Sequence, residues 1–165
     1  MLSISKIIID GVVLSLLASL FIVITIRLNP RIWLRDYPKD IQDKVPPKTQ
    51  KEKKLSLMLG IPFLILLVAV PFVSSLTLNL ENNGNISFYL LFLNAFGVAS
   101  IFNLVDWLLL DWVMFCTITP KFVVIPGTEG MAGYKDYFYH FRGFLIGTVT
   151  SAAAGLIIAG LVSFL

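Results

Sequence analysis

Four long apolar stretches, at 7–26, 55–78, 86–112 and 141–165, constrain this chain more than any other feature of its sequence. Each meets the length of about 20 residues that an α-helix needs to cross a hydrocarbon layer about 30 Å thick. The apolar residues run on without alternating with polar ones, so a β-barrel is not expected. Only 14% of the residues are charged, whereas soluble domains carry about a quarter. We therefore predict an all-α integral membrane protein with four transmembrane helices.

The distribution of cations predicts how these helices are oriented. Nine of the thirteen Lys and Arg residues lie between Arg27 and Lys54. Short loops rich in Lys and Arg stay in the cytoplasm, so we predict two cytoplasmic loops, outer N- and C-termini, and a multi-pass protein of the plasma (inner) membrane. The expected parts of the single membrane domain, 1–165, are spans at about 7–27, 55–78, 87–115 and 140–164, cytoplasmic loops at 28–54 and 116–139, and an outer turn at 79–86.

The first cytoplasmic loop contains four prolines, each of which restricts the residue before it to extended conformations. Helical turns are therefore expected only at 31–35 and 39–44. The simplest interpretation makes the loop a basic anchor, with Trp33 and Tyr37 at the lipid headgroups. The alternative is a platform for anionic headgroups, since each basic residue near an anionic leaflet contributes about 1 kcal/mol. Because orientation already accounts for the cations, no nucleic-acid partner is expected.

Small residues recur at every fourth position of the last apolar stretch. Residues four apart share one helix face, and small ones let another backbone approach closely. A matching stripe in the third stretch suggests the partner surface, although a homo-oligomer or another membrane protein would satisfy the same pattern. The small residues are Gly143, Gly147, Ser151, Gly155 and Ala159, and the matching stripe is Ala95, Ala99, Asn103, Trp107 and Asp111.

Two carboxylates, Asp106 and Asp111, interrupt the third apolar stretch, and each is followed by a tryptophan. One interpretation is that this segment marks the inner membrane boundary, where tryptophans gather. The other is a functional site, because charges within membrane segments are costly and usually serve a purpose. On a regular α-helix, residues five apart are about 140° apart around the axis. The two aspartates should then be unable to hold one ion from that helix alone.

The second cytoplasmic loop and the helix after it add ionisable residues on the same side of the membrane. Carboxylates there could bind a divalent cation, and an arginine could bind a lipid phosphate. The candidate ligand site consists of Asn103, Asp106, Asp111, Glu129, His140 and Arg142. Each also has a structural explanation: the arginine as a snorkelling anchor, the histidine as an interfacial residue, and the glutamate as a solvated loop acid.

Recognisable catalytic and cofactor motifs are missing from the sequence. Cys116 is the single cysteine, and there is no zinc motif, phosphate loop, nucleotide fingerprint or nucleophile elbow. No cofactor is therefore expected apart from a divalent cation at the candidate site, and no catalytic residue is assigned.

Three functional hypotheses follow. The first is a non-catalytic subunit or scaffold with a structured cytoplasmic rim; the stripe of small residues favours it, and the lack of a catalytic motif is consistent with it. The alternative is a membrane enzyme acting on a lipid or lipid phosphate at the cytoplasmic face. The second alternative is an oligomeric channel or transporter. Such a protein would need polar residues near the membrane centre, and this sequence supplies few of them there. A pocket deep enough for a headgroup between the loops would favour the enzyme, and an exposed glycine ridge on the last helix would favour the subunit.

Overall fold

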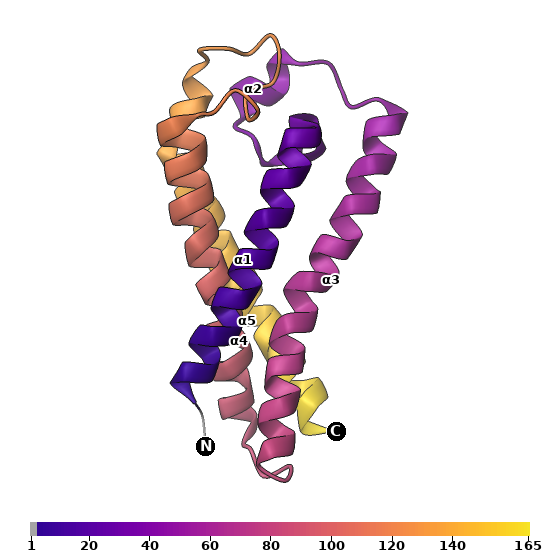
Figure 1. Ribbon diagram of the computed structural model, residues 1–165, viewed down its shortest axis with the longest axis vertical. Helices are drawn as coiled ribbons and strands as arrows, with labels where there is room; N and C mark the ends of the chain where they lie inside the picture. The colour runs from indigo at the N-terminus through magenta and orange to yellow at the C-terminus, as the bar shows by residue number, and fades with distance from the viewer. Residues whose placement is uncertain (1–2) are drawn as a thin grey trace.

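The computed structural model describes residues 3–165 as a bundle of four long helical segments (Figure 1). Each segment is long and apolar enough to cross a membrane, and no strand occurs among residues 3–165. The predicted all-α class with four apolar spans is therefore confirmed. The segments are α1 (Ile4–Leu28), α3 (Gln50–Glu81), α4 (Phe88–Val105) continued by η2 (Asp106–Ile118), and α5 (Tyr137–Ser163).

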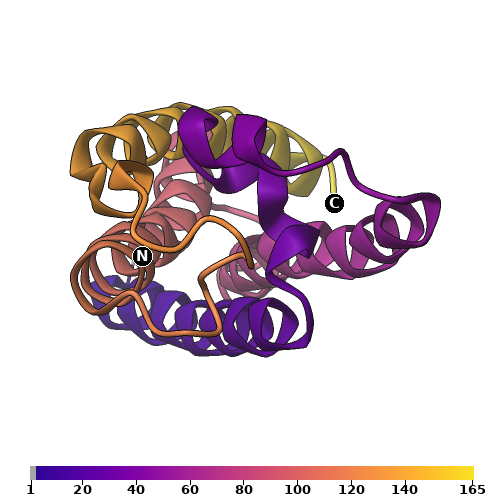
Figure 2. The same cartoon turned by 90° about the horizontal axis from the view of Figure 1, so that it is seen from above.

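Both longer loops lie at one end of the bundle, while the start of α1, the end of α5 and the turn between α3 and α4 lie at the other (Figure 1). The first loop contains η1 (Pro30–Asp36) and α2 (Lys39–Lys44), the two places where the prolines leave room for helical turns. The second loop contains η3 (Ala132–Lys135). Seen from above, the two loops cross over the end of the bundle (Figure 2).

The two loops pack on each other as a cap over this end. Its core joins Tyr37 and Ile41 of the first loop to Val123 and Tyr134 of the second. Hydrogen bonds fix the arrangement, because Tyr37 Oη donates to the carbonyl oxygen of Val123 (2.8 Å) and the amide of Gly133 donates to Asp40 (2.9 Å). We call these packed loops, residues 29–49 and 119–136, the cap.

The cap corrects the expectation that Trp33 and Tyr37 lie at the lipid headgroups. Tyr37 is only 2% exposed, and the indole of Trp33 donates to the buried hydroxyl of Thr25 (2.8 Å). Both rings point inward because they pack into the apolar core of the cap and so are not available to the lipid headgroups.

Glycines set the closest approaches between helices. A Cβ on Gly11 of α1 would lie 2.6 Å from the side chain of Ile101, and one on Gly155 of α5 would lie 3.2 Å from the backbone nitrogen of Phe96. Gly147 likewise faces Asn103 of α4. At Gly147 and Gly155 the small-residue face of α5 thus lies against α4 of the same chain. A Cβ on Gly143 would meet nothing within 4 Å, and this glycine lines a cavity.

This packing predicts a site-specific cost of enlarging α5. Gly155→Ile should lower the free energy of unfolding by about 1–3 kcal/mol, because the added atoms meet the backbone of α4. Gly160→Ile is the matched control, since nothing lies within 4 Å of its built Cβ. The measurement is the thermal unfolding midpoint of each variant in detergent. Equal midpoints for the two variants would contradict the close approach at Gly155.

Candidate ligand-binding cavity

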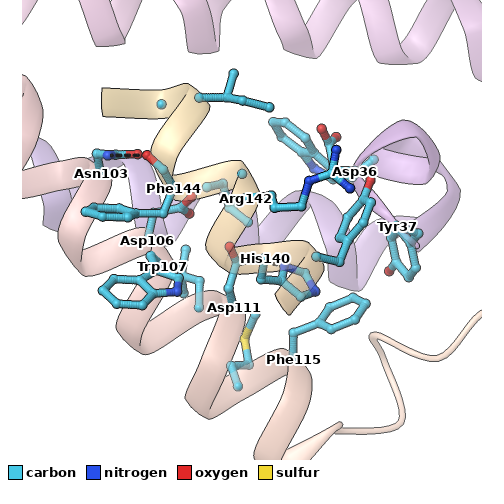
Figure 3. A pocket seen from close by; sticks show the side chains of 18 of the residues that line it. Asp36, Tyr37, Asn103, Asp106, Trp107, Asp111, Phe115, His140, Arg142 and Phe144 are labelled. Atoms are coloured by element: carbon cyan, nitrogen blue, oxygen red, sulfur yellow. Dashed lines mark hydrogen bonds and ion pairs between the residues drawn. The ribbon is translucent and has the colours of Figure 1, made fainter. Parts of the chain in front are cut away.

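A cavity of about 670 Å³ lies between the helices directly beneath the cap (Figure 3). Its volume falls within the range of roughly 300–1,000 Å³ that is usual for small-molecule sites. Apolar side chains of α1 and α3, among them Ile22, Phe63 and Leu67, form one wall. The opposite wall comes from α4, η2 and α5, and η1 closes the loop end.

The cavity exists because α3 and α5 diverge. At the end of the bundle opposite the cap the two helices are in contact, and Asn79 Nδ2 of α3 donates to the carbonyl oxygen of Val162 in α5 (3.3 Å). Toward the cap, α3 leans away from the other helices (Figure 1). Gly143 and the 63% exposed Ile146 line the cavity here. The cavity therefore opens sideways along α5.

The helix that carries the two aspartates is wider than an α-helix. From Asp106 to Ile118 the backbone forms a π-helix, in which hydrogen bonds span five residues. The amide of Thr119 accordingly donates to the carbonyl oxygen of Met114 (2.9 Å). The rings of Trp107 and Trp112, also five apart, meet with their centroids 4.7 Å apart.

The π-helix overturns the prediction that residues five apart here point in different directions. That prediction assumed a regular α-helix, and it is wrong because the extra residue in each wider turn brings residue i+5 closer in direction to residue i. Asp106 and Asp111 both line the cavity as a result.

Asp111 forms an ion-pair contact with His140, the only histidine of the chain. Its Oδ1 lies 3.0 Å from His140 Nδ1, so Nδ1 carries a proton and donates to the carboxylate. His140 is 5% exposed, and its Nε2 is buried without a hydrogen-bond partner among residues 3–165. The indole nitrogen of Trp107, also on the cavity wall, is unpartnered in the same way.

Asp106 differs from Asp111 because nothing neutralises it. Within residues 3–165 its side chain forms no hydrogen bond and no ion pair, although it lines the cavity. An unpaired carboxylate in a segment apolar enough to cross a membrane is costly, and such residues are retained for function.

Asp36, at the end of η1, brings a third carboxylate to the cavity. Asp36 is exposed to water, although many protein atoms lie near its carboxylate. This partial desolvation raises the pKa of Asp36 above its usual range, the Lys48 ammonium opposes the shift, and the negative charge of Asp111 adds to it. Asp36 and Asp111 are thus close enough to act on each other electrostatically.

The remaining predicted site residues divide into two groups. Asn103 lines the cavity, and its Nδ2 donates to the carbonyl oxygen of Phe144 and to Thr148 Oγ1, both at 3.1 Å. Arg142 lines the cavity from its exposed margin. Glu129 lies apart from the cavity in an exposed turn, where hydrogen bonds from its own amide and that of Gly127 lower its pKa.

Sequence reasoning missed the contribution of the first loop. Asp36, Trp33 and Lys39 all line the cavity, yet they precede Asp106 by about 70 residues and share no spacing with it. The one available signal was the position of Asp36 next to aromatic residues, since the loop contains other aspartates as well.

Chemically, the site combines carboxylates, one histidine and an apolar wall. No three His, Cys, Asp or Glu side chains within residues 3–165 lie close enough together to hold a metal ion. A histidine oriented by a carboxylate, as His140 is by Asp111, has the arrangement of a general base. No protein-family model, curated protein or solved structure matches this chain.

Proposed function

We propose that this chain is an integral protein of the plasma (inner) membrane, with its cap in the cytoplasm and both ends outside. The outward-facing apolar surface supports insertion into a membrane. In the most apolar 18-residue stretch of each long helix, only 11–28% of the residues are buried inside the bundle. The cations support the orientation: of the thirteen, only Lys6 lies at the end opposite the cap.

Within this frame, we propose that the protein binds an amphiphilic lipid in the cavity beneath the cap. The observation that carries the proposal is the division of the cavity lining. Apolar residues such as Leu67 and Ile146 line the part nearer the bundle centre, and Asp36, Asp111 and His140 line the part next to the cap. A lipid entering between α3 and α5 would place its chains against the former and its headgroup against the latter.

The other hypotheses receive less support from the geometry. A docking subunit would need a free glycine ridge on α5, but Gly147 and Gly155 face α4. A channel would need polar groups free to meet an ion, whereas the Nδ2 of buried Asn94 donates to Ser74 (2.9 Å) and Ser75 (3.1 Å). The proposal keeps the structured cytoplasmic rim of the first hypothesis. In it the cap is this rim, and it covers the cavity.

A membrane enzyme acting on the bound lipid is the second candidate function. The contact between Asp111 and His140 favours it, because a histidine held in one tautomer can accept a proton from a hydroxyl group or water. Binding is common to both candidates and is therefore tested first.

Filling the cavity should abolish lipid binding without disturbing the bundle. Gly143→Phe places a ring at a cavity-lining position that has nothing within 4 Å of a built Cβ. In the wild type, a lipid at about 100 times its dissociation constant should stabilise the fold by about 2.7 kcal/mol. We expect this stabilisation to be lost in Gly143→Phe. The measurement is thermal unfolding of delipidated protein with and without short-chain phospholipids.

Gly160→Phe is the control, since its built Cβ also meets nothing within 4 Å and the residue lies outside the cavity. It should keep the full response to lipid. If no lipid stabilises the wild type, or if both variants respond as it does, the cavity is not a lipid site.

A further inference from the structure

The polar groups at the cavity wall are mainly hydrogen-bond acceptors. Asp36, Asp106 and Asp111 supply carboxylate oxygens. His140 donates from Nδ1 to Asp111, so its unpartnered Nε2 is an acceptor when the ring is neutral. The side-chain amide protons of Asn103 are taken by Phe144 and Thr148. A ligand that complements these acceptors must donate hydrogen bonds.

The charge of the wall points to a cationic donor. Asp36 and Asp106 have no ion-pair partner within residues 3–165. Carboxylates that lie near one another repel each other unless a positive charge joins them. Arg142, the nearest cation of α5, is at the exposed margin and forms no ion pair with any described residue.

Aromatic side chains complete the surroundings. Trp107 and Tyr139 line the cavity beside the carboxylates, and aromatic faces attract cations. The cations of Lys39 and Arg142 and the hydroxyl of Tyr139 are donors on this wall, and they suit an acceptor group such as a phosphate. The wall therefore matches a ligand with a cationic end and an anionic group next to it.

On the basis of the proposed lipid-binding function, we infer that the bound lipid carries an alkylammonium group, as an aminophospholipid headgroup does, and that Asp106 and Asp111 hold this group. The ammonium donates to the two carboxylates, and the phosphate lies toward Arg142 and Lys39. The π-helix is what makes the site, because it places both carboxylates on the cavity side of one helix.

A headgroup comparison at constant chain length tests this inference. Delipidated protein in detergent is titrated with short-chain phosphatidylethanolamine, with phosphatidylglycerol of the same chains, with free ethanolamine and with Mg²⁺, and thermal unfolding is followed. We expect phosphatidylethanolamine to bind at least about tenfold more tightly than phosphatidylglycerol, the ratio that one charge-assisted hydrogen bond supplies. Asp106→Asn should remove this preference. Glu129→Gln, which changes an acid outside the cavity, should keep it.

The outcomes separate this inference from the proposed function. Equal binding of the two lipids would overturn the ammonium assignment and leave lipid binding intact. Stabilisation by ethanolamine with no response to either lipid would support the ammonium site and overturn the lipid. A response to Mg²⁺ alone that Asp106→Asn abolishes would make the carboxylates a metal site and overturn the assignment. The assignment would also be overturned if none of the four compounds stabilised the protein. If Asp106→Asn keeps the preference, Asp106 does not hold the ammonium group.

Discussion

Replacing Phe115 by alanine should lower the free energy of unfolding by about 3–5 kcal/mol, the usual cost of removing a buried phenyl ring. Phe115 is 6% exposed and lies where the cap meets the helices. Its ring centroid is 5.1 Å from that of Tyr37, 5.5 Å from Tyr134 and 4.7 Å from the imidazole of His140. Loss of this ring would remove a contact shared by both loops of the cap and by the histidine of the cavity.

The prediction is checked by thermal unfolding in detergent, with Phe138→Ala as the control. Phe138 lies at the same end of the bundle but is 68% exposed, so its removal should change the midpoint little. Similar midpoints for the two variants would mean that the cap is not part of the cooperative structure. In that case the roof of the cavity would be a separate, weakly held layer.

The helices could be predicted from sequence because each depends on a local property. A run of apolar residues in lipid has to satisfy its own backbone hydrogen bonds, and a helix does so within the run. The short helical turns of the first loop follow for a similar reason, since the prolines around 39–44 exclude most alternatives. The helix boundaries differ from the apolar runs because capping groups extend the helices. Thr49 and Glu52, for example, form a capping box that starts α3 at Gln50.

The cavity could not be predicted because it depends on two non-local features. One is the cap, in which Tyr37 hydrogen-bonds across 86 positions of sequence to Val123. The other is the π-helix, whose residues DWLLLDWVMFCTI carry no recognised signal for a widened turn. The assumption of a regular α-helix placed Asp106 and Asp111 on different sides of the helix, although both belong to the one candidate site predicted from the sequence.

Two aspartates in the long helices show how differently the same side chain is accommodated. Asp10 of α1 is neutralised, because Lys6 lies 3.1 Å away and Ser74 Oγ donates to it at 2.6 Å. Asp106 has neither kind of partner within residues 3–165. A charge that the fold satisfies contributes to stability, and a charge that it leaves unsatisfied opposes it and is available to a ligand.

This contrast predicts substitutions of opposite sign. In the delipidated protein, Asp106→Leu should raise the free energy of unfolding by about 1–4 kcal/mol, because an uncompensated carboxylate is replaced by an apolar side chain at a cavity with room for it. Asp10→Leu should lower it by about 1–3 kcal/mol, because Lys6 and Ser74 both lose their partner. Both positions have room for a leucine side chain, since Asp10 also borders a cavity, which measures about 290 Å³. The opposite signs expected therefore do not come from a difference in available space.

The measurement is the unfolding midpoint of both variants in the same detergent, followed by titration of Asp106→Leu with the lipid that stabilises the wild type. A more stable protein that no longer responds to lipid would identify Asp106 as a residue kept for binding at the expense of stability. A less stable Asp106→Leu would instead mean that the carboxylate supports the fold. Its partner would then have to be sought among the other polar groups that line the cavity.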